Sequence, residues 1–375
     1  MGQDARHDGL DRLKAGVTLL VVCHHTAITY GGAGGWFYRE LPQGDHPSSI
    51  ALTFFCAINQ AWFMGLFFLV AGFFTPSALA RKTTGAYLRD RFVRLGLPLL
   101  VFGWLLGPAT IALVQWATRD RDFADVMLLL WQRGEFEQGP LWFAKALLVM
   151  SLASLVVYRL LGWPKAGARP FPSNAQLLAA AVVCGLAAYA LRLVWPVGAE
   201  WWGLQLGYFA SYVILYAAGC LAAQRGWLDQ IHAPGPQAQV RRWKRIAWVT
   251  LPLLAPLGLL KAASPLLQAD PMDGWNLPAL VYAFWEPFVA WGVILWLLTR
   301  AQKGGASSPL WQRLSRRAYA IYVIHPLPVV AIALAWRHVE APALLKFAVT
   351  AMLACVACYV LAGLLLRLPG VRRVL

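Results

Sequence analysis

The chain has 375 residues, of which 59% are hydrophobic and only 13% are charged. Soluble domains carry about 25% charged residues, so this composition excludes an ordinary soluble enzyme and a disordered or fibrous chain, and it predicts a multi-pass membrane protein. The formal net charge of +16 does not call for a nucleic-acid partner, because membrane proteins concentrate Lys and Arg in their cytoplasmic loops.

Apolar stretches recur along the whole chain. A helix needs roughly 20 apolar residues to cross about 30 Å of hydrocarbon. About ten stretches qualify: 10–30, 50–75, 92–116, 140–161, 175–195, 203–223, 244–262, 277–299, 315–336 and 342–366. They are continuously apolar, which favours helices over the alternating strands of a barrel. The sequence predicts an all-α polytopic membrane protein, with residues 1–375 forming one membrane-embedded domain.

The loops between these stretches differ in charge. Roughly 24 of the 33 Lys and Arg residues lie on one set of ends, which the positive-inside rule assigns to the cytoplasm. An even number of spans puts both termini on that side. The loops 31–49, 117–139 and 263–276 are predicted to face outward, and they hold most of the acidic residues.

Ionisable groups inside membrane spans are costly and are therefore functional candidates. They are Lys14, His24, His25, Lys145, Glu286 and His325. Eleven helical positions bring His25 to within about 20° of Lys14 and about 16 Å along the axis. Asp11 lies one turn before Lys14 and is expected to pair with it. His25 is the stronger catalytic candidate, whereas His24 points about 100° away and is interpreted as a packing residue.

Glu286 lies within the eighth predicted span, at a depth about 6 Å from that of His25. This depth is consistent with a cavity shared by the two residues. The alternative is a Glu that is protonated or held by a structural partner.

Three further groups have a functional and a structural interpretation. Arg91 and Arg94, one turn apart at the cytoplasmic end of the third span, are either topogenic charges or a phosphate clamp. Tyr322 and His325 share a helix face and resemble a buried packing cluster. Trp142 opens the fourth span, as interfacial aromatic anchors do. No serine-hydrolase, P-loop, zinc-protease or dinucleotide motif occurs, and no metal site is predicted.

These residues stand in motifs that resemble those of the acyltransferase 3 family. The run from Leu10 to Ala15, followed by His25, is similar to the family's LDxLRA pattern with a His after it, although Lys14 stands where the family has Arg. Residues 64–74, 87–98, 139–143, 285–286 and 315–326 match further family motifs in family order. Residues 206–228 resemble the glucan succinyltransferase-like branch.

The resemblance implies acyl transfer in the bacterial cytoplasmic (inner) membrane. Acetyl-CoA or succinyl-CoA, as the cytoplasmic acyl-CoA donor, would pass its acyl group to a hydroxyl of an envelope or exported glycan or a related acceptor. The family's key His maps to His25, and its CoA-linked arginines map to Arg91 and Arg94, with Lys14 beside them. No metal takes part, and the partners are the donor, the acceptor and the lipid bilayer.

His25 would act as general base or as an acyl-accepting nucleophile, with Glu286 orienting it or contacting the acceptor. Asp11, Trp142, Tyr322 and His325 would support substrate or structure. The alternative is a transporter or a lipid or glycan flippase without CoA chemistry, for which no inverted repeat is found. A non-catalytic scaffold would not explain the ionisable groups kept in the spans.

Overall fold

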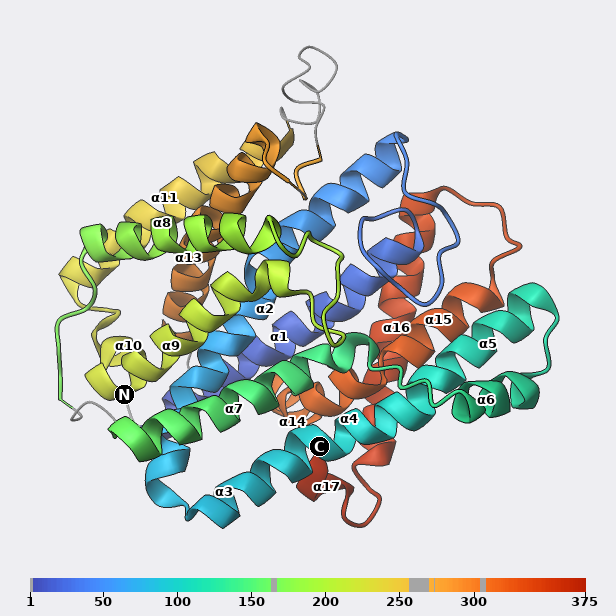
Figure 1. Ribbon diagram of the computed structural model, residues 1–375, viewed down its shortest axis with the longest axis horizontal. Coiled ribbons are helices and arrows are strands. Elements are labelled where there is room, and N and C mark those ends of the chain that lie inside the picture. Colours follow the sequence, from blue (N-terminus) through green and yellow to red (C-terminus); the bar gives the residue numbers. More distant parts are fainter. Residues whose placement is uncertain (1–2, 163–166, 256–269, 273, 304–307) are drawn as a thin grey trace. The chain divides into compact units, whose positions relative to one another are not determined.

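The computed structural model of the chain describes residues 3–162, 167–255, 270–272, 274–303 and 308–375. Helices make up 79% of the structure, and no strand occurs in these ranges (Figure 1). This confirms the predicted all-α class. The end of the predicted span 244–262 and most of the predicted outer loop 263–276 lie outside the described residues.

The first half of the chain forms long helices, one of which is interrupted by two π-helical turns. The elements are α1 (Gln3–Thr29), α2 (Pro47–Arg81), α3 (Thr84–Arg91), η1 (Phe92–Gly96), α4 (Leu97–Val101), η2 (Phe102–Leu106), α5 (Gly107–Arg119), α6 (Phe123–Gln132), η3 (Gly139–Leu141) and α7 (Trp142–Leu161). The π-helical turns η1 and η2 lie inside the third predicted span. Such turns occur frequently at functional sites.

The second half adds further helices. They are α8 (Asn174–Arg192), η4 (Leu206–Tyr208), α9 (Phe209–Arg225), α10 (Trp227–Gln230), α11 (Pro234–Thr250), η5 (Leu251–Leu253), α13 (Leu277–Lys303), α14 (Pro309–Ile324), α15 (Pro326–Ala335), α16 (Ala343–Leu365) and α17 (Val371–Val374). The chain bends by 70° between α14 and α15, at the His325-Pro326 step. Proline fits the first turn of a new helix and cannot continue the old one.

Seven helical stretches of the described residues are long and apolar enough to cross a membrane. They are Pro47–Arg81, Thr84–Arg119, Gly139–Leu161, Asn174–Arg192, Leu206–Arg225, Leu277–Lys303 and Ala343–Leu365. The bent pair α14–α15 makes an eighth if it counts as one span. The helix α1 contains the first predicted span, but its charged and histidine residues lower its hydropathy. The chain is a multi-pass membrane protein; the count of ten and the side of the termini stay predictions.

The chain divides into two compact units, each built from separate segments. The first unit comprises Met1–Leu10, Ile58–Tyr87 and Met150–Gly305, and the second comprises Asp11–Ala57, Leu88–Val149 and Ala306–Leu375. The expectation of one domain over residues 1–375 stays a prediction.

In the first unit, α13 packs against α8 and α11. Close helix contacts depend on glycine: a Cβ on Gly72 of α2 would overlap the Tyr216 carbonyl of α9, and one on Gly219 of α9 would overlap the Leu69 carbonyl. Small residues allow membrane helices to approach this closely.

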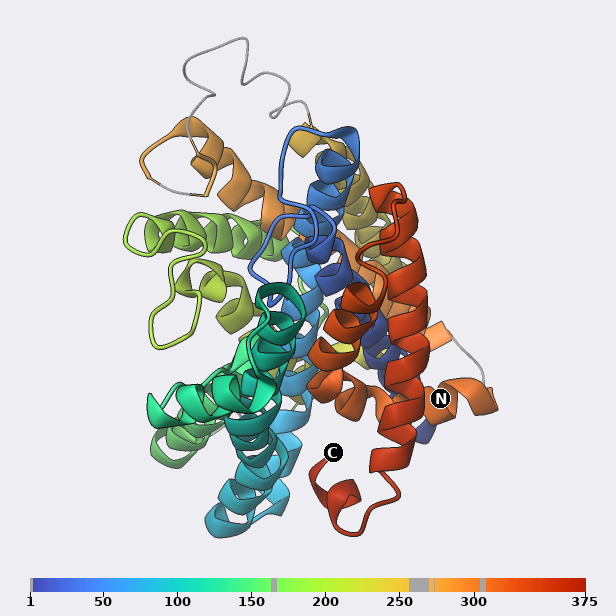
Figure 2. The same ribbon diagram turned by 90° about the vertical axis from the view of Figure 1, so that its right-hand side faces the viewer.

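In the second unit, α14 and α15 both pack against α16, and α5 packs against α6 and α15. The red helix α16 runs beside the orange-red α15 in both views (Figures 1 and 2). This packing brings α15 to the segment that follows α1. A buried cluster around Tyr30, Leu52 and Val330 fills the contact.

Candidate functional site

Two histidines far apart in the sequence meet in the second unit. His25 lies in the last part of α1 and is partly buried, whereas His325 lies at the bend between α14 and α15 and is 0% exposed. The Nδ1 atom of His25 is 2.8 Å from the Nε2 atom of His325. Their rings are nearly parallel, with centroids 4.9 Å apart and 14° between the planes. The hydrogen bond and the nearly parallel ring planes give the two histidines a defined relative orientation.

The positions of the protons on this pair follow from the backbone at Pro326. Pro326 has no backbone N–H, so it cannot donate to the Tyr322 carbonyl four residues earlier. The Nδ1 atom of His325 lies 2.7 Å from that oxygen. A carbonyl oxygen only accepts, so Nδ1 of His325 is the donor and carries the proton.

The proton positions of His25 follow from this bond. In a neutral imidazole one nitrogen donates and the other accepts, so Nε2 of His325 accepts and Nδ1 of His25 donates to it. The remaining nitrogen of His25, Nε2, then holds an unprotonated lone pair. This is the form that accepts a proton from a hydroxyl or attacks a carbonyl carbon.

Trp36 covers one face of the pair. Its ring lies parallel to His25, with centroids 4.1 Å apart and 7° between the planes, and parallel to His325 at 5.8 Å and 13°. His24 meets His25 edge-on at 5.4 Å and 86°. Stacking and edge contacts fix the plane of the His25 ring, so its Nε2 atom points in one direction.

The loop that carries Trp36 is itself anchored. The Ser49 hydroxyl donates to the Gly31 carbonyl at 2.6 Å. Glu40 forms an ion pair with Lys346 of α16, whose side chain is 4% exposed. Removing one partner of a buried pair leaves an uncompensated charge, so this pair ties the Trp36 loop firmly to α16.

The Trp142 motif and the Tyr322 motif meet in the same unit. The hydroxyl of Tyr322 donates to the carbonyl of Pro140 in η3, directly before Trp142 opens α7. Gly139 has a φ of +42°, which favours glycine, and a Cβ there would lie 2.9 Å from the Phe37 ring. Tyr322 thus links α14, the helix that leads to His325, to the turn that precedes α7.

Arg91 and Arg94 both contact Asp90. The Nη2 atom of Arg91 is 2.6 Å from Asp90 Oδ2, and the Nε atom of Arg94 is 3.4 Å from Oδ1. The Arg94 side chain is 63% exposed and that of Arg91 is 26% exposed. Asp90 therefore holds both arginine side chains, and the guanidinium of Arg94 is accessible to solvent.

The Arg94 backbone is linked to the helix that leads to His325. Pro98 cannot donate to the Arg94 carbonyl, just as Pro326 cannot donate to that of Tyr322. The hydroxyl of Tyr319 donates to this carbonyl instead. Tyr319 in turn stacks on Tyr322, with centroids 6.2 Å apart, so the arginine turn and the histidine pair are joined through α14.

The predicted pairing of Lys14 with Asp11 is confirmed. The Nζ atom of Lys14 lies 2.6 Å from Asp11 Oδ1, and the two side chains are 36% and 46% exposed. Both belong to α1, the continuous helix that also carries His25. Their predicted roles in donor binding and support remain predictions.

Glu286 belongs to the first unit, where it is buried against Arg192. The Nη2 atom of Arg192 donates to Glu286 Oε2, and the two side chains are 1% and 8% exposed. The Arg192 guanidinium also lies 5.5 Å and 5.1 Å from the ring centroids of Tyr208 and Tyr282. The structure thus gives Glu286 a structural partner, which is the alternative that the sequence left open.

Two residues of these arrangements escaped the sequence analysis. Arg192 lies inside the predicted span 175–195, and its charge alone was a signal that it is a buried functional or structural group. Trp36 lies in a predicted outer loop, and nothing in its local sequence distinguishes it from an interfacial aromatic residue. No group of three or more His, Cys, Asp or Glu residues that could hold a metal ion occurs in the described part of the chain.

Residues 7–365 match the sequence model of the acyltransferase 3 family, described as an acyltransferase domain. The chain belongs to this family. It is therefore an acyltransferase, and its apolar helices make it a membrane enzyme. No curated protein and no solved structure gives a significant match to the chain. The glucan succinyltransferase-like branch stays a prediction for this acyltransferase.

Proposed function

We propose that this membrane acyltransferase moves an acetyl or succinyl group from cytoplasmic acyl-CoA to a hydroxyl of an envelope or exported glycan, or a related acceptor, in the bacterial inner membrane. One observation carries the proposal: the hydrogen-bonded chain from the Tyr322 carbonyl through His325 to His25. It leaves the Nε2 atom of His25 unprotonated and fixed in direction.

The transfer requires a base because a hydroxyl is a weak nucleophile at neutral pH. Nε2 of His25 removes the hydroxyl proton while the oxygen attacks the thioester carbonyl carbon. The carbon–sulfur bond then breaks, and the CoA thiolate leaves and takes the proton back from His25. His325 keeps Nδ1 of His25 engaged throughout and stabilises the imidazolium orientation.

A second route uses His25 as nucleophile. Its Nε2 atom attacks the thioester carbon, the CoA thiolate leaves, and an acyl-imidazole forms, which the acceptor hydroxyl then attacks. The partly buried position of His25 beside Trp36 is compatible with both routes. Mass spectrometry of protein quenched with acyl-CoA but no acceptor distinguishes them, because only the second route leaves an acyl group on His25.

The donor is proposed to bind in the second unit, beside Arg91, Arg94 and Lys14. Arg91, Arg94 and Lys14 are cationic groups, and the exposed Arg94 offers a rigid donor fork to phosphate oxygens. The acceptor would approach from the loop that carries Trp36, on the predicted outer side. Family membership favours this acyl transfer over the transporter or flippase alternative.

The test of the proposal is the loss of transfer when His25 changes. His25→Gln should lower transfer from acetyl-CoA or succinyl-CoA by about 10²- to 10⁴-fold, the usual contribution of a general base. Labelled acyl-CoA and membranes containing the acceptor glycans provide the assay. The protein should still insert and unfold at the same temperature.

His24→Gln is the matched control. His24 is the adjacent buried histidine, but His25 and not His24 bonds to His325. Transfer by His24→Gln should stay within about tenfold of the wild type. Full transfer by His25→Gln would show that His25 is not the reacting residue.

A further inference from the structure

An arginine-lined cavity lies in the second unit, away from the histidine pair. Its volume is about 410 Å³. The lining residues are Arg313, Arg316, Arg317, Gly363, Leu366, Arg367, Arg372 and Leu375. From the sequence, all five arginines count among the basic residues predicted to be cytoplasmic, and Arg316 and Arg317 also lie in the motif 315–326. Arg313, Arg316 and Arg317 lie within the residues that match the family, whereas Arg367 and Arg372 lie beyond them.

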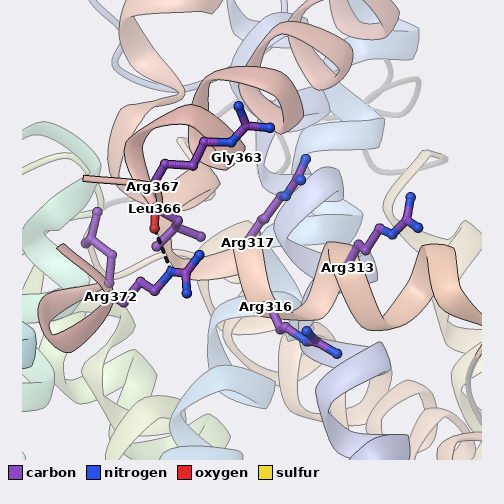
Figure 3. A pocket seen from close by; sticks show the side chains of 8 residues that line it. Arg313, Arg316, Arg317, Gly363, Leu366, Arg367 and Arg372 are labelled. Carbon is purple, nitrogen blue, oxygen red and sulfur yellow. Dashed lines mark hydrogen bonds between the residues drawn. The ribbon is translucent and has the colours of Figure 1, made fainter. Parts of the chain in front are cut away.

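Three separate segments bring these arginines together. Arg313, Arg316 and Arg317 come from α14, Arg367 follows the end of α16, and Arg372 lies in α17. Figure 3 shows their side chains arranged around one space, with the bond from Arg372 Nε to the Leu366 carbonyl dashed. That bond is 2.7 Å long.

Arg317 is held in a fixed position in the cavity wall. Its Nη1 atom donates to the Tyr359 carbonyl at 3.0 Å, and its guanidinium lies 4.1 Å from the Tyr359 ring centroid. Gly363 provides the room, because a Cβ there would lie 2.6 Å from the Arg317 guanidinium carbon. A topogenic charge needs no such fixed position, so these contacts distinguish a built site from a cytoplasmic charge cluster.

The arginines of the cavity have no acidic side-chain partner among the described residues. Like charges repel one another, and this cost is relieved when a multiply charged anion enters. Arginine forks match phosphate oxygens in geometry as well as charge.

We infer that this cavity binds the phosphate groups of a phosphorylated ligand. Under the proposed function, on which this assignment of the ligand rests, they are the phosphates of the acyl-CoA donor. The headgroup of an anionic phospholipid also carries a phosphate, so binding of CoA and binding of anionic lipid are both measured.

The position of the cavity suits a CoA thioester. Arg313, Arg316 and Arg317 lie eight to twelve residues before His325 along α14, which corresponds to an axial distance of about 12–18 Å. The pantetheine arm has the backbone length of about four amino-acid residues, or about 14 Å when extended. Phosphates in the cavity would therefore let the thioester reach the depth of the histidine pair.

The cavity also adjoins the predicted CoA arginines. α17, which carries Arg372, packs against the π-helical turn η1, which carries Arg94. CoA has a diphosphate and a separate ribose phosphate. The two groups of arginines supply two neighbouring phosphate sites for it.

The double variant Arg313→Gln with Arg316→Gln tests the inference. Both side chains are exposed, so the full-length protein should fold as the wild type does. With the purified protein in neutral-lipid nanodiscs, the Kd for CoA and the Kd for inorganic pyrophosphate should each rise at least tenfold, because two charge-assisted contacts are lost. Arg241→Gln with Arg242→Gln, two exposed arginines of α11, is the matched control and should stay within about twofold.

Anionic lipid is the second arm. Native mass spectrometry of protein from phosphatidylglycerol nanodiscs counts retained lipids. Fewer retained lipids in the double variant, with an unchanged Kd for CoA, would assign the site to a lipid phosphate. Unchanged binding of CoA, pyrophosphate and lipid would overturn the inference.

The outcomes also separate this inference from the proposed function. Wild-type protein that binds pyrophosphate in an Arg313- and Arg316-dependent way but does not bind CoA would refute the donor and keep the phosphate site. If the Gln double variant unfolds, the double variant Arg313→Lys with Arg316→Lys replaces it. This variant keeps the positive charges but lacks the planar guanidinium groups. It should then bind pyrophosphate several-fold more weakly than the wild type, and equal binding would count against the site.

Discussion

At the scale of single residues, the chemistry depends on proton positions. His25 is the proposed general base, but a histidine acts as a base only through an unprotonated nitrogen. The structure supplies that condition through His325, whose Nδ1 atom is bound to a backbone carbonyl. Under the proposed function, His325 is a positioning residue that acts through His25.

We predict that His325→Phe lowers kcat by roughly 10²-fold and leaves the KM for acyl-CoA nearly unchanged. The phenyl ring keeps an aromatic side chain beside Trp36 but cannot accept from Nδ1 of His25, so His25 loses its defined tautomer. His325→Gln, whose amide oxygen can accept, should retain more activity than His325→Phe. Equal kcat values in the two variants would argue against the tautomer role, and steady-state kinetics at saturating acceptor measures them.

Glu286 and Arg192 form the other buried polar group at this scale. Both side chains are less than a tenth exposed, and breaking such a pair leaves one charge unpaired. If the pair is only structural, replacing both partners should preserve acyl transfer. If Glu286 is catalytic, the same double replacement should abolish it.

We predict that Glu286→Gln alone lowers the free energy of unfolding by about 3–5 kcal/mol, the usual cost of breaking a buried pair. Glu286→Leu combined with Arg192→Met should recover most of this loss. Thermal unfolding and acyl transfer are measured on the single and double variants. Restored stability with restored transfer would assign Glu286 a structural role, whereas restored stability without transfer would support its predicted catalytic role.

At the scale of elements, prolines leave three helical carbonyls without a backbone donor, so that side chains can bond to them. Pro98, Pro108 and Pro326 remove the helical donors to Arg94, Trp104 and Tyr322. In each case a side chain donates instead: Tyr319, Trp131 and His325 respectively. Membrane helices tolerate proline when neighbours satisfy the freed groups, and here those neighbours include a residue of the site.

We predict that Pro326→Ala lowers kcat by about tenfold without lowering the unfolding temperature. Alanine restores a backbone N–H that can donate to the Tyr322 carbonyl and displace Nδ1 of His325 from it. Pro328→Ala is the control, since Pro328 lies in the same helix without this link to a histidine. If the two variants behave alike, proline has no special part in the site.

At the scale of the whole molecule, positive charge and catalytic groups divide between two units. The histidine pair, the predicted CoA arginines and the arginine cavity all belong to the second unit, whereas the Arg192–Glu286 pair belongs to the first. The second unit therefore holds the residues that we propose for donor binding and for base catalysis.

The bent helix pair provides a test of the membrane topology. If α14 and α15 together form one span, Leu310, which is 64% exposed, faces the cytoplasm, and Glu340 faces outward. We predict that an impermeant thiol reagent labels Glu340→Cys in intact cells but labels Leu310→Cys only after permeabilisation. Labelling of both positions from one side would instead make the pair a re-entrant loop.

Local patterns predicted much of this protein. Long apolar runs and one-sided charges predicted helices and membrane insertion, because a helix in hydrocarbon satisfies its own backbone hydrogen bonds. Motif spacing predicted the acyltransferase family and selected His25, since spacing along one helix determines which residues share a face. The bend at Pro326 has a local cause too, although its role in setting a tautomer does not.

By itself, the sequence determined the all-α membrane class, the family, and the residues that can carry charge or protons inside the spans. Only the tertiary structure decided which of these residues meet. His25 and His325 are 300 positions apart, and Arg192 and Glu286 are 94 apart. Trp36 and the cavity arginines likewise acquire their neighbours through helix packing. Periodicity and composition describe one segment at a time, whereas these contacts depend on the combined packing of several segments, which no single stretch of sequence encodes.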